Sequence, residues 1–462
     1  MHEVISALSL PLPEEILRLR EAGETEEVME ALESWLKRPL PQMLRNRLLV
    51  EQERMRRLSG EYPYTREEVL RQAMDAFPAM TEKDFRQLEL EGKISFLMDH
   101  GNKRYFVRAV PTLKGDADVR RRFGLKVESA DANRDPLMRA VMERGNLRRR
   151  LTLEIGIGMK EEAFRPGHYR AWLPLPLERD QQSEVEIEAG DAYIAASDAP
   201  QRTAFFEKDL EKPGMFSLKC RYVNTIRYAD PWKGKPEVLY PASPKPGAED
   251  LAEDGLYMRF TPYLRQLAAE LTQDLKSDLE RAWAFYCFVT QQVKYSFVRE
   301  YFLLDALGEF CAVNLRGDCG LQALLFILLC RISGIPARWQ SGLAMDDLDP
   351  GMHDWAQFYL SGWGWLFADC SFGGSAFRNG SEERHRFYFG NLDPMRYAAA
   401  RTFFGEFDPP CRFIRHDPYD NQTGEIELDG RSPDWTEVRR VHRLLRCEEW
   451  TEQGWTTVFE QN

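Results

Sequence analysis

Cys319 is the residue in this sequence whose surroundings best suit covalent chemistry. It follows Gly317 and Asp318 and precedes Gly320, and the apolar run after it predicts a buried helix. The first turn of a helix favours a thiolate, because its unpaired N–H groups and dipole stabilise negative charge. The flanking glycines let backbone and substrate approach closely. These features predict a cysteine nucleophile at the start of a helix.

The other seven cysteines lack such a setting. They are scattered, with no Cys-x-x-Cys pair and no histidine at metal-ligand spacing, so neither a disulfide framework nor a zinc site is expected. This usage favours a reducing, cytoplasmic compartment. A thiol among apolar residues stays neutral and inert. The seven are Cys220, Cys287, Cys311, Cys330, Cys370, Cys411 and Cys447.

Two downstream residues could complete a catalytic triad with this thiol. His353 and Asp369 lie on two alternating apolar stretches that a glycine-containing turn joins, which predicts a β-hairpin. They are an even number of positions apart, so a regular hairpin places both side chains on one face. Asp354 and Cys370 would then point the other way. Asp369 would orient the imidazole while His353 takes the thiol proton.

Each of these residues taken alone is more often structural than catalytic. The triad hypothesis depends on their combination with the glycine flanks and the helix start. His385 and His416 are weaker candidates for the base, since neither lies on a patterned strand. The backbone N–H of Cys319 is one expected oxyanion donor, and Tyr295 or Asn314 are the candidates for a second donor.

The elements that would position these residues fall into three regions. Residues 1–145 are predicted to be helical, with one β-hairpin that makes a winged-helix-like unit conceivable. Residues 146–240 alternate with period two and predict a β-sandwich-like domain without catalytic residues. A proline-rich linker follows it. Residues 250–462 are the predicted catalytic domain.

Composition and charge exclude several function classes. The 462 residues carry a net charge of −12, which disfavours nucleic-acid binding even though Lys103, Arg104 and Arg108 lie on the predicted hairpin. The N-terminus lacks the pattern of a secretory signal. The longest uninterrupted apolar run, 323–330, is too short to span a bilayer. We therefore expect neither a nucleic-acid nor a membrane partner. The oligomeric state is not readable from the sequence.

The motifs around the predicted triad, taken as a set, resemble the bacterial branch of the transglutaminase-like superfamily. Order and spacing agree. The motifs are Gly317-Asp318-Cys319, Gly334-Ile335-Pro336-Ala337-Arg338, His353-x-Trp355, and Gly364-Trp365 leading to Asp369. The stretch Trp172-Leu173-Pro174-Leu175-Pro176 also looks like the domain that often precedes this core. The first 145 residues resemble no family.

The resemblance implies an α+β fold with a papain-like core, in which a central helix packs against an antiparallel sheet. Cys319 would form a thioester with an amide carbonyl of a peptide or protein substrate. Water would then give hydrolysis, and an amine would give transamidation; a non-enzymatic scaffold is the third alternative. No cofactor and no metal are expected, because the acidic run 346–349 is more typical of a solvated loop than of a calcium site. Cys370 stands where the family often has proline or a small residue, so a disulfide with Cys319 under oxidation stays open.

Overall fold

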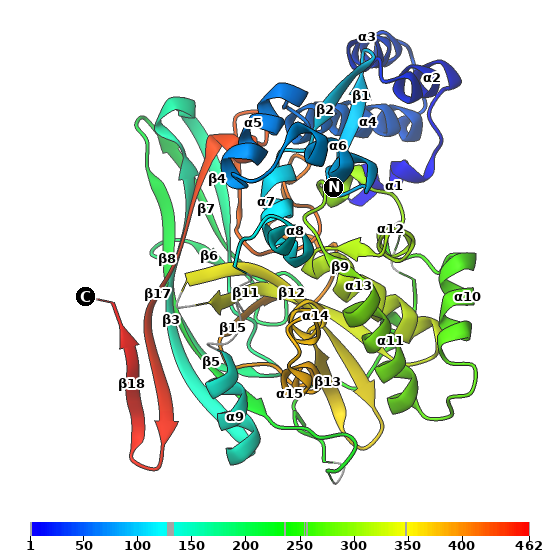
Figure 1. Cartoon of the computed structure of the whole chain (residues 1–462). Helices are drawn as coiled ribbons and strands as arrows, with labels where there is room; N and C mark the ends of the chain where they lie inside the picture. Colours follow the sequence, from blue (N-terminus) through cyan, green and yellow to red (C-terminus); the bar gives the residue numbers. More distant parts are fainter. Residues whose placement is uncertain are drawn as a thin grey trace.

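A five-stranded antiparallel sheet and the buried helix α13 form the centre of the molecule (Figure 1). The computed structural model describes residues 2–126, 134–234, 237–253, 255, 257–346 and 349–461. Part of the acidic run 346–349 therefore lies outside the described residues. The sheet has the order β14 (Phe389–Gly390), β13 (Gly364–Ala368), β12 (Asp349–Leu360), β11 (Ala337–Asp346) and β15 (Arg396–Ala400).

Helix α13 (Cys319–Ile332) crosses one face of this sheet and packs mainly on β11 and β12. Every residue from Gly320 to Arg331 is buried, as its apolar sequence predicts. Helices α10 (Pro262–Leu271), α11 (Asp278–Gln292), α12 (Leu307–Asn314) and α14 (Cys370–Arg378) pack against it, and α15 (Glu382–Phe387) packs on α14. The short strands β9 (Lys294–Tyr295) and β10 (Arg316–Gly317) pair in parallel just before it. The mixed architecture is the α+β fold that the sequence predicts.

The β-sandwich lies beside this core, and β11 and β12 reach into it (Figure 1). One sheet has the order β16 (Glu425–Leu428), β4 (Gly167–Pro174), β7 (Thr203–Leu210) and β6 (Tyr193–Ile194). The other has the order β18 (Gly454–Glu460), β17 (Val438–Thr451), β3 (Asn146–Met159), β8 (Met215–Arg227) and β5 (Gln182–Glu188). Leu343, Met345 and Tyr397 of the central sheet share the sandwich's apolar core. The two regions therefore pack as one body.

The C-terminal strands do not follow the predicted division at 240 and 250. Strand β16 pairs with β4, and β17 pairs with β3 along eleven registered residue pairs, so residues 425–460 complete the sandwich. The sequence instead predicts that these residues belong to the catalytic domain, 250–462. The physical reason is that β3 and β4 are each paired on one side by β8 and β7, and β17 and β16 pair with the edges that would otherwise be left open.

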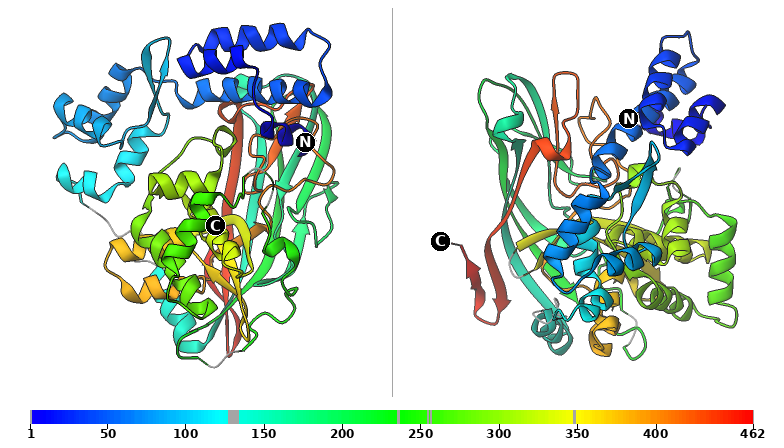
Figure 2. Two further views of the ribbon diagram at one scale, coloured as in Figure 1. Left: turned by 90° about the vertical axis from the view of Figure 1, so that its right-hand side faces the viewer. Right: turned by 45° about the horizontal axis from the view of Figure 1, so that its top comes forward.

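The N-terminal region is helical, as predicted; its helices within residues 2–90 gather at one end of the molecule, whereas the helix Asp135–Arg144 lies near the opposite end (Figure 1 and Figure 2). Its elements are α1 (His2–Ser6), a 3-10 turn (Ala7–Ser9), α2 (Glu14–Ala22), α3 (Thr25–Leu36), α4 (Gln42–Glu61), α5 (Arg66–Ala76), α6 (Glu82–Leu90), β1 (Phe96–Asp99), β2 (Asn102–Tyr105), α7 (Ala109–Gly115), α8 (Ala117–Arg122) and α9 (Asp135–Arg144). Short 3-10 turns also occur at Glu161–Ala163, Ala248–Asp250, Tyr301–Leu303 and Trp435–Glu437. Capping boxes form at the starts of α5 and α6, at Thr65 and Thr81.

The basic residues of the β1–β2 region bind groups of the protein itself. Lys103 Nζ lies 2.8 Å from Glu89 Oε1, and Arg104 Nε lies 3.8 Å from Asp99 Oδ2. Arg108 lies over the Phe297 ring at 5.1 Å. None of the described helices combines the length and hydropathy needed to cross a bilayer.

We predict that Leu324→Ala lowers stability by about 2–5 kcal/mol, because Leu324 is fully buried on α13 and truncation leaves a cavity in the core. The urea midpoint of unfolding measures this. Leu90→Ala is the matched control, since Leu90 is 76% exposed and its loss should cost under about 0.5 kcal/mol. Equal midpoints for the two variants would contradict the burial of α13.

Candidate active site

Cys319 is the first residue of α13 and is partly exposed. Its neighbour Gly320 is required by close packing, since a Cβ there would overlap the hydroxyl oxygen of Tyr301 and lie 2.9 Å from Asp354 Oδ2. The N-cap residue Asp318 accepts a hydrogen bond from Leu321 N at 3.2 Å, and the Tyr301 hydroxyl donates to the same carboxylate. Gly320 therefore allows the start of α13 to pack closely against Tyr301 and Asp354.

His353 and Asp369 lie together, as their even spacing predicts. His353 Nε2 is 2.8 Å from Asp369 Oδ2, and both side chains are buried. Phe372 stacks on the imidazole, with ring centroids 4.3 Å apart. Because Asp369 is ionised, Nε2 must be the donor, and Nδ1 is left as the nitrogen that can accept a proton.

Asp369 is held in its charged form by its other partners. Arg396 Nη1 donates to Oδ2 at 2.8 Å, and Oδ1 accepts from Phe372 N at 3.0 Å at the start of α14. Burial alone would raise the pKa of this carboxyl, but the charges of His353 and Arg396 outweigh burial and hold the pKa well below its usual range. Asp369 therefore stays a carboxylate throughout the range in which histidine titrates.

The sulfur of Cys319 contacts Asp354, the residue next to His353 on β12. Sγ lies 3.4 Å from Asp354 Oδ2, and Asp354 Oδ1 accepts from Gln422 Nε2 at 2.6 Å. Within the described ranges, no hydrogen bond joins Cys319 to His353. Consecutive residues of a strand point to opposite faces. The structure thus places His353 against Asp369. It places the Cys319 sulfur against Asp354, the next residue of β12.

Acidic side chains surround the thiol. Burial and the charges of Asp354 and Asp318 hold the pKa of the Cys319 thiol well above its usual value. Burial raises the pKa of Asp318 to about 6, and burial with the Asp318 charge raises the pKa of Asp354. The sequence-based expectation that the helix start lowers the thiol pKa is therefore overturned. The carboxyl groups outweigh the helix dipole, and the thiol is protonated at neutral pH.

The other predicted site residues are distributed differently. Tyr295 pairs with Gly317 in the β9–β10 ladder, and Gly317 lies two residues before Cys319. The Tyr295 backbone is therefore close to Cys319. Asn314 donates to Phe310 O at 2.8 Å within α12, and lines a cavity of about 140 Å³ together with Phe297 and Arg316.

The two alternative bases are occupied elsewhere. His385 Nε2 lies 2.8 Å from Thr290 Oγ1, and burial lowers the pKa of His385 to about 4. His416 Nε2 lies 3.4 Å from Glu300 Oε1, and its ring packs on Trp435. Cys370 is a free, buried thiol at the start of α14.

Four residues of the site were not predicted. Arg396 and Gln422 come from segments far downstream, and no local pattern marks either of them. Tyr301 precedes the nucleophile in an irregular stretch. Asp354 carried the one usable signal, because an acid beside a candidate base is chemically unusual. Strand alternation predicts that Asp354 points to the face opposite His353, but it does not indicate which face the helix covers.

Comparison with known proteins assigns the region around this site. Residues 265–370 match the sequence model of the transglutaminase-like superfamily. A comparison with curated protein sequences found no match.

Solved structures give distant likenesses. A Cytophaga hutchinsonii protein named "Putative Cysteine Protease" is 14% identical, with a TM-score of 0.42, over 69% of this chain and 92% of its own. The periplasmic domain of TgpA from Pseudomonas aeruginosa is 15% identical, with a TM-score of 0.27, over 54% of this chain and 96% of its own. Likenesses this distant do not bear on the activity of this chain.

We predict that Asp354→Asn speeds alkylation of Cys319 by iodoacetamide near pH 7. Removal of the adjacent carboxylate lowers the thiol pKa, and each unit of that shift raises the thiolate fraction about tenfold. Mass spectrometry of the Cys319 peptide across a pH series measures the rate. Asp209→Asn, at an exposed carboxylate far from the site, should leave the profile unchanged. An unshifted profile in Asp354→Asn would contradict the described contact.

Proposed function

Because the chain carries a transglutaminase-like domain at residues 265–370, we propose that it is a cysteine-dependent hydrolase that cleaves a peptide or amide bond through a thioester on Cys319. The observation that carries the proposal is the 2.8 Å contact between His353 and Asp369, because His353 lies on β12 next to Asp354, the residue that the Cys319 sulfur contacts. A positioned histidine with an ionised carboxylate behind it is the arrangement that activates a thiol.

The reaction begins with movement of the sulfur. In the described state the thiol donates to Asp354, so the sulfur must leave Asp354 and approach Nδ1 of His353 before it can be deprotonated by this base. Catalytic hydrogen bonds are often long in the free enzyme and tighten when substrate binds. His353 then takes the proton, and the sulfur attacks the amide carbonyl carbon.

Collapse of the tetrahedral intermediate breaks the C–N bond. The imidazolium of His353 gives its proton to the leaving amine, and a thioester remains on Cys319. His353 then removes a proton from water as the oxygen attacks the thioester carbon, the C–S bond breaks to release the acid, and the imidazolium returns the proton to the sulfur of Cys319. Asp369, held ionised by Arg396, stabilises the imidazolium in both halves. The Cys319 backbone N–H at the helix start is one oxyanion donor.

Transamidation is the second candidate, and the acidic surroundings of the thiol favour it. Asp318 and Asp420 both lie close enough to Asp354 to influence its ionisation. A protonated primary amine, as on a lysine side chain, would be attracted to such a group of carboxyls. The amine would then replace water as the acceptor of the thioester.

The nucleophile is tested with a library of electrophilic peptides. We predict that a covalent adduct forms on Cys319, that Cys319→Ala forms none, and that Asp369→Asn reacts about 10²–10⁴-fold more slowly because the imidazole loses its orientation. Intact-protein and peptide mass spectrometry measure the adduct. Circular dichroism checks that the variants are folded. Labelling of Cys319 no faster than that of the buried cysteines would sink the proposal and favour a non-enzymatic scaffold.

The acceptor is tested separately with a glutamine-containing peptide and a fluorescent primary amine. Hydrolase activity predicts release of ammonia and a glutamate product, with no fluorescence in the peptide at high amine concentration. Incorporation of the amine that depends on Cys319 would replace hydrolysis with transamidation as the main reaction.

A further inference from the structure

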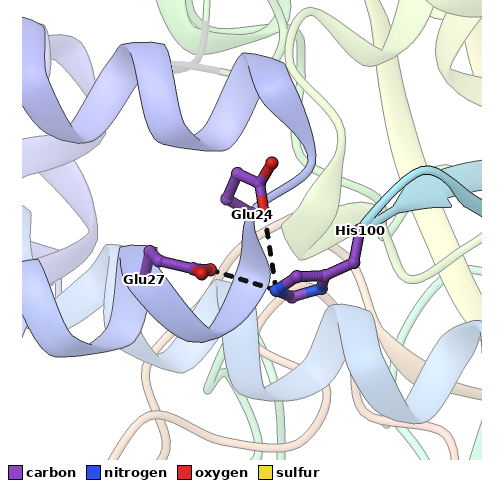
Figure 3. Close-up of side chains that lie close together, drawn as sticks. All are labelled: Glu24, Glu27 and His100. Carbon is purple, nitrogen blue, oxygen red and sulfur yellow. Dashed lines mark hydrogen bonds and ion pairs between the residues drawn. The ribbon is translucent and has the colours of Figure 1, made fainter.

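We propose that Glu24, Glu27 and His100 form a binding site for a divalent transition-metal ion, with Zn²⁺ as the best-suited example (Figure 3). Their ligand atoms lie within 4.8 Å of one another. In the ranges that the structure describes, no other group of three His, Cys, Asp or Glu side chains meets this condition. The site lies in the N-terminal region and uses no residue of the candidate active site, so it does not rest on the proposed function.

The ring nitrogens of His100 have different surroundings. Nε2 faces two carboxylates, 3.0 Å from Glu27 Oε2 and 3.5 Å from Glu24 Oε2, while Nδ1 lies 3.1 Å from Asp99 Oδ1. A single N–H on Nε2 cannot point at both glutamates, whereas a cation between the three atoms can bind all of them. A carboxylate on the other ring nitrogen is the usual support of a metal-bound histidine.

The backbone holds the three side chains in place. Glu24 is the N-cap of α3 and Glu27 lies three residues on, so the two project from the same part of the helix. His100 has a left-handed φ of 47° at the turn between β1 and β2, and its N–H donates to Gly23 O at 2.9 Å. Gly23 is itself left-handed, and a Cβ there would lie 2.5 Å from Met98 O. The helix corner and the hairpin turn are therefore in direct contact.

His168 is a histidine in this protein whose contacts with carboxylates are simple ion pairs, and it serves as the comparison for His100. Its Nδ1 lies 2.8 Å from Asp209 Oδ1 and its Nε2 lies 3.0 Å from Glu207 Oε1, so each nitrogen has one carboxylate. A protonated imidazole satisfies that arrangement completely. The two histidines have similar exposure, 36% for His100 and 40% for His168. His168 is therefore a matched control for charge and exposure without convergent ligands.

The donor set indicates the metal class. One imidazole nitrogen and two carboxylate oxygens suit Zn²⁺, Co²⁺ or Ni²⁺, with water completing the coordination. The ion would join the α2–α3 corner to the β1–β2 hairpin, which are far apart in sequence. Because only the folded chain brings these ligands together, binding would stabilise the N-terminal region.

The test is a titration of the full chain with Zn²⁺ at pH 7.5, in which calorimetry measures the heat of binding. All variants carry Cys319→Ala, so that the thiol and His353 do not bind the metal as a pair. We expect one site in the parent, its loss in His100→Ala and Glu27→Gln, and its retention in His168→Ala. Asp99→Asn should weaken the affinity by about 10–100-fold. Binding of Co²⁺ gives the same comparison through its visible absorption.

Glu27→Gln keeps the size of the side chain, so it decides the question if His100→Ala unfolds. Undiminished Zn²⁺ affinity in folded Glu27→Gln and His100→Ala would overturn the site. An equal loss of affinity in His168→Ala would overturn it as well, because it would show a general effect of surface charge. The electrophile labelling of Cys319 has a separate readout, so failure of one proposal does not imply failure of the other.

Discussion

The buried carboxylate of Asp369 is the interaction on which the site depends. A charge without solvent is costly unless it is fully paired, and Asp369 is paired with His353, Arg396 and the first turn of α14. These partners come from β12, β15 and α14, so one carboxylate connects three elements. Arg396 is in turn bound to Asp393 at 2.6 Å. The orientation of the imidazole is therefore a property of the whole core.

Two further carboxyl groups, those of Asp354 and Asp318, oppose ionisation of the Cys319 thiol. Asp354 faces the sulfur and, with Asp318, keeps the thiol protonated. His353 and Asp369 provide a base one residue away. In the described state the thiol contacts Asp354, and its proposed base, His353, is hydrogen-bonded to Asp369. Catalysis by this site requires the sulfur to exchange one partner for the other.

Much of this core could be predicted from the sequence, because the signals were local. The apolar run after Cys319 specifies a buried helix, and the even spacing of His353 and Asp369 specifies a shared face of the hairpin. Parity relates one strand to its neighbour, but it does not say which face the helix covers. The position of Asp354 against the sulfur was missed for that reason.

The other features that the sequence did not predict depend on contacts between residues that are far apart in the chain. The partners of β16 and β17 lie more than two hundred residues earlier in the chain, and alternation alone does not identify a partner strand. His100 and Glu27 are 73 positions apart, so no spacing rule brings them together, and no metal was expected from the sequence. Folding, rather than local pattern, creates both features.

The most direct test of the central claim is a crystal structure of the chain with a peptide aldehyde bound covalently to Cys319. We predict that the sulfur leaves Asp354, that His353 Nδ1 lies within about 4 Å of the sulfur, and that the His353–Asp369 hydrogen bond is kept. A structure with the adduct formed, the sulfur still on Asp354 and His353 turned away behind packed side chains would contradict the account.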